Sequence, residues 1–480
     1  MPEGTAWLGP RLAEWAARLR YEDLPPTVVA KAKALLLDTL SVGWAGSGAE
    51  GMAEMHALVQ AQGGAGESRV WAFGGSLPAT QAAFLNGSMA AALDFDSVHD
   101  LAGAHSDGVV IPAVLALAER ERLSGREFLA AYAAGSEILV RLSLAVRARP
   151  GWFYSSVLGV FGAAAGASRA LRLDAAPACH AMGVALSRAA GTQQSLAERS
   201  LSKRLQTAFA SRDGVDAALL AACGVTAPAQ MFEGAAGFCA LYGEIDAAVA
   251  LEGLGREFHF TALTMKKYAS CYCNHAAIQA AIDLVHRHGL CAADVREVAV
   301  RITPFMARLV GAPYAPGDNP QVSAQFSVQY SVASVLLRGR FALEDIMPAA
   351  AKDPEVCELA SRVVIEIDGT QTGKYVPATV RVRTASGTTL EATATQLCGT
   401  PSNPMPEPEL HAKALACLGT GVRPIRQDAA RRLAARIASV DTVTDMRAFL
   451  APTAIGDQRD SGYDPALDEK ATIQESQGGI

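Results

Sequence analysis

Apolar residues recur at steps of three and four from about residue 10 to residue 260, which predicts a long series of helices. The pattern is clearest in VVAKAKALLLDTLSVGWAG (28–46) and in GREFLAAYAAGSEILVRLSLAV (125–146). Pro25-Pro26 begins the first of these helices, and Ser124-Gly125 precedes the second. This part of the chain therefore predicts a bundle of many helices.

The pattern changes near residue 265. Apolar and polar residues alternate in DVREVAVRITPF (294–305), in RVVIEIDG (362–369) and in ATVRVRTASGTTLEATATQ (378–396), which predicts half-buried strands. The last stretch is a hairpin candidate with its turn at Ser386-Gly387. Because QFSVQYSVASVLLRG between them is helical in pattern, residues 266–400 predict a smaller α+β domain.

A helical pattern returns after residue 400, and DAARRLAARIASV (428–440) predicts an amphipathic helix. The expected fold is mainly α, with one large all-helical domain formed by residues 1–265 and 401–455. Residues 456–480 are polar and without pattern, so we expect a disordered tail there.

The composition and net charge of the chain limit the classes of function that it could have. With 480 residues, 50% of them apolar, the chain can build two domains with sizeable cores. A net charge of −6 argues against a partner nucleic acid. No signal peptide is visible and no apolar run approaches the 18 or more residues of a membrane span, so we expect a cytoplasmic protein. The nine cysteines are then expected to be reduced.

The stretch LDFDSVHDLAGAHSDG (93–108) gathers four aspartates and two of the nine histidines at the edge of an apolar helix. A loop that carries His105 and Asp94 at the mouth of a helical core suits acid/base chemistry. The alternative is a solvated loop with its acids as caps.

Two further stretches could bind a carboxylate. In GWFYSSVLGVFGAAAGAS (151–168), Ser155 or Ser156 would cap a helix whose N-terminus attracts anions; the alternative is capping plus close packing at the glycines. In SLSKRLQTAFASRDG (200–214), Lys203 and Gln206 share a helical face, and Arg204 is suited to bidentate contacts; the alternative is an exposed basic face.

The stretch MKKYASCYCNHAAIQAA (265–281) lies where the pattern changes, and clefts between domains often bind ligands. Lys266, Cys271 and His275 could each carry a proton. Cys271-x-Cys273-x-His275 would put three ligand types on one face of a strand, but this is not a usual zinc spacing, so we expect no metal. Packing of the two cysteines is the common alternative.

These stretches, together with QFSVQYSVA and GTPSNPMPEPEL, resemble the MmgE/PrpD family in sequence and order. That family includes 2-methylcitrate dehydratase, cis-aconitate decarboxylase and iminodisuccinate epimerase. The resemblance covers the chain to about residue 450. It implies a large helical domain, a smaller α+β lid, a homodimer, no organic cofactor, and a site for a small di- or tricarboxylate between the domains.

The resemblance also implies roles for residues. Asp94, His105, Lys203 and Lys266 match the family's motifs, and Tyr330 matches less closely. We therefore expect catalytic roles for these four and for Cys271. The residues expected to bind substrate are Ser155, Ser156, Arg204, Gln206, His275 and Tyr330.

The chain departs from the family pattern at several positions. Ala91 and Phe153 stand where many members have histidine, and Val98 stands where many have threonine. Cys271 stands where the dehydratase and the decarboxylase have a histidine. This cysteine favours the cysteine-containing branch of the family, and the epimerase has a similar sequence at this place. The leading interpretation is a hydro-lyase, with an epimerase or a decarboxylase as alternatives. A catalytically inactive family member that binds a carboxylate is the alternative of another class.

Overall fold

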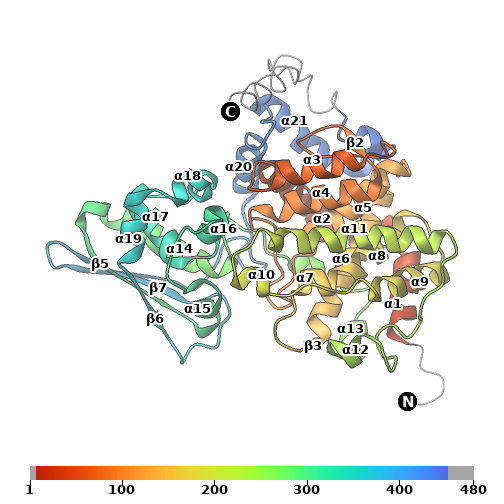
Figure 1. The fold of residues 1–480 in the computed structure, drawn as a ribbon, viewed down its shortest axis with the longest axis horizontal. Coiled ribbons are helices and arrows are strands. Elements are labelled where there is room, and N and C mark those ends of the chain that lie inside the picture. Colours follow the sequence, from red (N-terminus) through yellow and green to blue (C-terminus); the bar gives the residue numbers. More distant parts are fainter. Residues whose placement is uncertain (1–6, 452–480) are drawn as a thin grey trace, which may run out of the picture.

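The computed structural model describes residues 7–451, so the predicted tail at 456–480 lies outside the described residues. The described chain is mainly helical, as the sequence predicts, with a large helical bundle beside a smaller α+β region (Figure 1). The principal helices of the bundle are α1 (Leu8–Arg18), α2 (Pro26–Gly46), α3 (Met52–Gln62), α4 (Ala79–Ala92), α5 (Asp107–Arg120), α6 (Gly125–Ala145), α7 (Tyr154–Val157), α8 (Gly159–Ala170), α9 (Ala175–Leu186) and α11 (Ser202–Ala222).

Local sequence signals explain where several helices begin. Pro26 occupies the first turn of α2, where a proline loses no hydrogen bond. Ser124 caps α6, because its hydroxyl accepts from the backbone N–H of Glu127 and the Glu127 carboxylate accepts in return. Small residues then let helices approach closely: a Cβ added to Gly162 in α8 would lie 2.7 Å from the carbonyl oxygen of Gly135 in α6. The glycines of α8 therefore serve packing.

Helix α6 is long and apolar enough to cross a membrane by length and composition, and among the described residues it alone meets that test. However, 94% of its most apolar window is buried inside the bundle. Its surroundings are α8, α5 and α13 (Ala247–Leu251), so its apolar surface is covered by protein.

The α+β region contains a four-stranded sheet in the order β6-β5-β7-β8. Strands β5 and β6 are parallel, and the other neighbours are antiparallel. The hairpin expected around Ser386-Gly387 is formed by β7 and β8, and Gly387 takes a φ of 87° in its turn. The elements of this region are α14 (His275–His288), β5 (Val295–Ile302), α15 (Pro304–Val310), α16 (Pro320–Gln325), α17 (Val328–Arg338), α18 (Pro348–Ala351), α19 (Pro354–Ser361), β6 (Val363–Ile367), β7 (Ala378–Thr384) and β8 (Thr389–Ala394).

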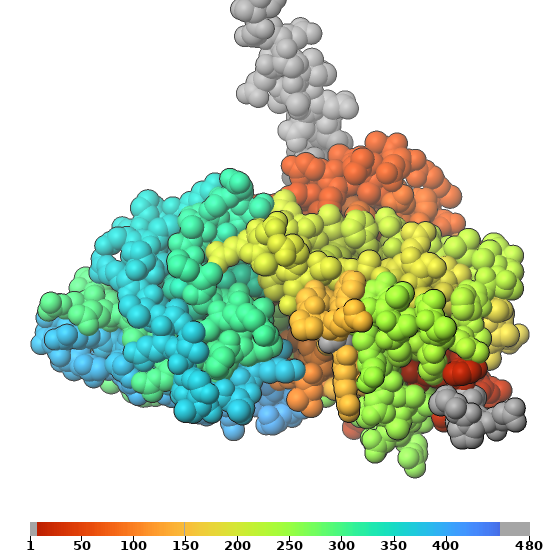
Figure 2. Space-filling view, turned by 60° about the horizontal axis from the view of Figure 1, so that its bottom comes forward, coloured from red at the N-terminus to blue at the C-terminus, as the bar shows by residue number. Residues whose placement is uncertain are grey.

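After the sheet the chain crosses back to the bundle. Helix α20 (Glu407–Leu418) packs against α2, and α21 (Gln427–Ala438) packs against both α2 and α20. In Figure 1 these two blue helices lie on the bundle, beside the orange helices of the N-terminal part. On the face drawn in Figure 2, the green and cyan surface of the α+β region adjoins orange and yellow segments of the bundle.

Candidate functional site

The residues that carry the predicted chemistry meet where the bundle adjoins the α+β region. The acid segment, residues 93–108, connects α4 to α5. Asp94 has a φ of 49°, a left-handed conformation that turns the chain directly after α4. Val98 and Thr264 exchange backbone hydrogen bonds of 3.0 and 2.8 Å. This bridge joins the acid segment to the junction segment, residues 264–275, two residues before Lys266.

Asp94 lies between two lysines. Its Oδ1 accepts a hydrogen bond from Lys203 Nζ of α11, and its Oδ2 lies 3.1 Å from Lys266 Nζ of the junction segment. Lys266 Nζ also donates to the backbone oxygen of Asp94 at 2.6 Å. Asp94 is 3% exposed and Lys266 is 1% exposed. One buried carboxylate therefore serves two ammonium groups.

The charges in this group decide one another's protonation. Burial alone would raise the pKa of Asp94, but the ammonium groups of Lys203 and Lys266 hold it well below its usual range. Burial likewise opposes the charged form of Lys203, but Asp94 and Asp96 raise the pKa of this lysine. Asp94 and Lys203 are therefore both charged at neutral pH.

His105 is held beside this group by Asp96. Its Nδ1 lies 3.0 Å from Oδ2 of Asp96, which is buried. Burial would raise the pKa of Asp96, but His105 lowers it. The backbone N–H of His105 donates to Ser155 Oγ at 2.9 Å. With Nδ1 turned to a carboxylate, Nε2 remains as the atom that could exchange a proton. The imidazole side chain keeps 13% exposure.

We call Asp94, Asp96, His105, Lys203 and Lys266 the charged cluster. Two aromatic rings border it on the side of Lys203, whose Nζ lies 5.9 Å from the ring centre of Phe153 and 5.5 Å from that of Phe326. Phe153 comes from the bundle and Phe326 from the α+β region, so both parts of the molecule border this ammonium.

Cys271 lies next to the cluster on the junction segment, and its backbone N–H donates to the Gln325 carbonyl at 2.9 Å. A hydrogen bond from the Cys273 thiol lowers the pKa of Cys271, and the charge of Lys266 lowers it further. Burial and the charge of Asp94 act in the opposite direction. The pKa of Cys273 is raised well above its usual value, first by burial. The pair therefore favours a thiolate on Cys271 and a thiol on Cys273.

The prediction that Cys271, Cys273 and His275 lie on one strand is wrong. Residues Tyr272–Asn274 form a single 3₁₀ turn, and His275 begins α14, so the three side chains do not share a strand face. Across residues 7–451, no three His, Cys, Asp or Glu side chains are grouped so that they could hold a metal ion.

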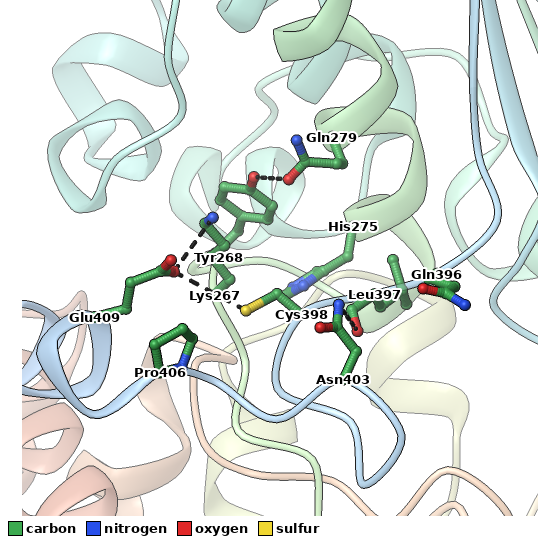
Figure 3. A pocket seen from close by; sticks show the side chains of 10 residues that line it. All are labelled: Lys267, Tyr268, His275, Gln279, Gln396, Leu397, Cys398, Asn403, Pro406 and Glu409. Atoms are coloured by element: carbon green, nitrogen blue, oxygen red, sulfur yellow. Dashed lines mark hydrogen bonds and ion pairs between the residues drawn. The ribbon is translucent and has the colours of Figure 1, made fainter.

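His275 lines a cavity of about 290 Å³ on another side of the junction segment, which Figure 3 shows from close by. Its Nε2 has no hydrogen-bond partner, and burial, followed by the charge of Lys266, lowers its pKa to about 3. The side chain of Lys267 lines this cavity, and its Nζ lies 3.3 Å from Oε2 of Glu409 (Figure 3). No member of the charged cluster lines the cavity. His275 therefore stays neutral and faces different neighbours from those expected.

The other residues expected to bind substrate have structural partners. Arg204 donates to the Glu50 carbonyl at 2.6 Å, and burial lowers its pKa to about 10. Tyr330 donates to the backbone oxygen of Asp345 inside the α+β region. The structure does not bring these two side chains to Asp94.

The serines differ from the capping prediction. Helix α7 begins at Tyr154 with Phe153 as its cap residue, so Ser155 and Ser156 lie inside the helix and the expected serine N-cap is wrong. Ser155 instead supports His105, whereas Ser156 donates to the Gln206 backbone oxygen at 3.0 Å. The Gln206 amide donates to the Thr192 carbonyl at 2.9 Å.

Two contributors to the site were missed at the sequence level. Asp96 stands two residues after Asp94, and its place in the acid segment was a usable signal. Phe326 lies in the stretch QFSVQYSVA, but nothing local indicated its contact with Lys203, because that contact joins positions more than a hundred residues apart.

The fold and the charged cluster define a two-part, mainly helical protein with acid, base and ammonium groups buried at the junction. Family models described as the MmgE/PrpD N-terminal domain and the MmgE/PrpD C-terminal domain match residues 10–248 and 268–439. The chain therefore belongs to the MmgE/PrpD family, as its sequence motifs indicate.

Curated relatives carry the name of one activity of that family. The chain is 28% identical over 366 residues to human cis-aconitate decarboxylase, covering 72% of this chain and 74% of that protein. It is 26% identical over 472 residues to cis-aconitate decarboxylase of Aspergillus terreus, covering 92% of this chain and 94% of that protein. It is 27% identical over 394 residues to the cis-aconitate decarboxylase-like protein oryM of Aspergillus oryzae, covering 75% and 79%.

Proposed function

We propose that the chain is an enzyme that moves a proton at the carbon next to a carboxylate of a small di- or tricarboxylate, without an organic cofactor. The observation that carries this proposal is the pair of lysine ammonium groups converging on Asp94, with the His105–Asp96 pair beside them. Lysines and a histidine of this kind answer the two needs of such chemistry, which are charge stabilisation and proton transfer.

In this proposal Lys203 and Lys266 bind substrate carboxylates. Removing a proton next to a carboxylate builds negative charge on the carboxylate oxygens, and fixed cations in a buried site stabilise that charge strongly. Asp94 holds both ammonium groups in place before substrate arrives. His105 exchanges the proton through Nε2 while Asp96 orients its ring.

Cys271 is the proposed second proton carrier. A hydro-lyase needs a base that takes the α-proton and an acid that protonates the departing hydroxyl, so that water leaves and a double bond forms. His105 and Cys271 are two possible carriers from different segments of the chain beside one pair of cations, and the pKa of Cys271 is lowered. This supports the hydro-lyase as the leading assignment.

Two other reactions use the same groups. In an epimerase, one carrier removes the α-proton and the other returns it on the opposite face, and the lowered pKa of Cys271 favours this alternative. In a decarboxylase, the carbon that loses CO₂ takes up one proton, and the names of the curated relatives favour that alternative. A family member that binds a carboxylate without turnover is the remaining alternative, motivated by the departures from the family pattern at Ala91, Val98 and Phe153.

We further propose that the α+β region acts as a lid over the charged cluster, that two copies of the chain form a homodimer, and that the protein works in the cytoplasm. The contact of Phe326 with Lys203 supports the lid, since it brings the α+β region to a substrate-binding ammonium. Light scattering after size-exclusion chromatography tests the dimer, and a monomer mass would contradict it.

The decisive experiment is a substrate panel followed by NMR in deuterated water. The panel contains 2-methylcitrate, citrate, cis-aconitate, iminodisuccinate and tartrate analogues. An unsaturated product with loss of water supports the hydro-lyase, deuterium entry with inversion supports the epimerase, and release of CO₂ supports the decarboxylase. Binding of a panel member without any turnover would contradict the enzymatic proposal.

A further inference from the structure

Lys413 of α20 holds three segments of the chain together. Its Nζ lies 2.6 Å from Oδ1 of Asp38 in α2, 2.8 Å from the backbone oxygen of Lys266 and 3.1 Å from the backbone oxygen of Phe95. The two backbone oxygens accept hydrogen bonds from this ammonium group, and the Asp38 carboxylate forms an ion pair with it. The same Nζ lies 3.8 Å from the ring centre of Phe95.

The two carbonyl groups belong to the backbone that carries the charged cluster. Phe95 stands between Asp94, which pairs with the lysines, and Asp96, which pairs with His105. Lys266 supplies one of the two ammonium groups on Asp94. Lys413 therefore fixes the acid segment and the junction segment relative to each other, at the point where their side chains pair.

We propose that Asp38 and Lys413, together called the anchor, are positioning residues that hold Asp94, Asp96 and Lys266 in their working arrangement. This inference rests on the proposed function of the cluster. It adds two residues that neither the acid segment nor the junction segment contains, contributed by the first long helix of the bundle and by the helix that returns to it.

The burial of the anchor argues for a positioning role. The side chain of Lys413 is 6% exposed and that of Asp38 is completely buried. Burial raises the pKa of Asp38, and Lys413 opposes that rise. A buried ion pair is often no more stabilising than apolar residues of the same volume. Stability alone therefore gives little reason for a pair here, whereas the two hydrogen bonds from Lys413 to the backbone of the acid segment and the junction segment do.

The test replaces both charges at once, so that no buried charge is left unpaired. In the variant Asp38→Leu with Lys413→Met, the Phe95 and Lys266 carbonyls lose their common donor. Small displacements of catalytic groups are expensive, so we expect kcat on the active panel member to fall about 10²-fold. If this variant does not fold, Asp38→Asn with Lys413→Gln replaces it, with the same expectation.

A matched control exists in α6. Arg141 and Glu137 form a completely buried pair with an N–O distance of 2.6 Å, and Arg141 also donates to the backbone oxygen of Glu257 at 2.8 Å. This pair resembles the anchor but holds no residue of the charged cluster. Glu137→Leu with Arg141→Met should change the melting temperature but leave kcat unchanged.

A second readout needs no substrate. The rate of Cys271 alkylation by iodoacetamide, followed against pH by peptide mass spectrometry, reports the thiolate fraction. Asp94 raises the pKa of Cys271 and Lys266 lowers it, so displacement of these two groups in the anchor variant should shift the alkylation profile along the pH axis. The control variant should keep the wild-type profile.

The two readouts separate the two proposals. If no panel member is turned over, the proposed function fails, and the alkylation profile still decides the anchor. If the anchor variant and the control give the same alkylation profile, the anchor proposal is overturned, whatever the turnover.

Discussion

Asp94 and Asp107 belong to one short segment of the chain, and both are buried, yet their pKa values shift in opposite directions. The Lys203 and Lys266 ammonium groups overcome burial at Asp94 and hold its pKa well below the usual range. Asp107 accepts hydrogen bonds from the hydroxyls of Ser97 and Tyr132, and burial raises its pKa to about 6.

The difference shows that counter-ions, rather than burial, decide which of these two buried carboxyls is ionised. Two cations next to Asp94 keep it ionised, and in the proposed function the same cations bind an anionic substrate. Neutral hydroxyl donors at Asp107 stabilise a carboxyl whose ionised form is penalised by burial. We therefore expect substitutions around Asp94 to change activity and substitution of Asp107 to change stability.

The largest effect is expected at His105, which Asp96 orients beside the lysines. His105→Ala should lower kcat about 10²- to 10⁴-fold, because it removes a positioned proton carrier. Steady-state kinetics on the active panel member measure the loss. His288→Ala, which removes an exposed imidazole at the end of α14, is the control and should behave as wild type. Unchanged turnover of the His105 variant would refute the assignment.

Cys271 is expected to be nearly as sensitive. Cys271→Ser should lower kcat about 10²-fold or more, since a serine hydroxyl does not ionise near neutral pH without an activating base. Substrate should also protect Cys271 from iodoacetamide. Cys273→Ser keeps a hydroxyl that can donate to Cys271, so most activity should remain. A Cys271 variant that loses stability but little activity would identify a packed thiol.

Two neighbouring lysines give a smaller and more controlled contrast. Lys266→Met should lower kcat/KM about 10²-fold, because it removes one of the two cations that bind carboxylates. Lys203→Met should act similarly. Lys267→Met changes the next residue. Lys267 and its partner Glu409 line the cavity beside His275, which no member of the charged cluster lines, so this variant should leave kcat/KM nearly unchanged. Equal losses in the Lys266 and Lys267 variants would contradict the carboxylate-binding role.

The smallest effect on activity is expected at Asp107. Its folded-state pKa of about 6 lies above the ordinary value of 3.8, so folding favours the protonated form. That contribution is complete below about pH 4 and is lost as the pH rises through 6, a change of roughly 3 kcal/mol. The amide side chain of the variant Asp107→Asn cannot ionise. The melting temperature of this variant should therefore rise relative to that of wild type between pH 4 and pH 7. A constant difference across this range would mean that Asp107 does not titrate there.

Local periodicity was sufficient for much of the fold. Three-and-four spacing predicted the bundle helices, and alternation predicted β5, β6 and the β7–β8 hairpin. The prediction of a serine N-cap before α8 was wrong, because the hydroxyl of Ser155 is bonded to a residue far away in the sequence. Ser155 accepts a hydrogen bond from His105, fifty residues away, and that contact is not written in the helix itself.

The candidate site was predictable only in part. Asp94, His105, Lys203 and Lys266 were expected from their motifs, and the structure brings them together with Asp96. Residue spacing alone does not separate Asp94 from Asp107, and only the motif match selected Asp94. The partners that make the two carboxyls differ come from α11, α6 and the junction segment. His275 and Tyr330 share motifs with the site, but their side chains serve other contacts.

The anchor also bears on when the protein becomes competent during its synthesis. Lys413 emerges from the ribosome well after Asp94 and some 150 residues after Lys266. At ordinary elongation rates that interval is roughly 7–30 s. Throughout it, the nascent bundle carries Asp38 without its cation, and the paired segments lack their common donor. Anchoring of the charged cluster therefore waits until residue 413 has been made, and in this proposal activity depends on the synthesis of α20.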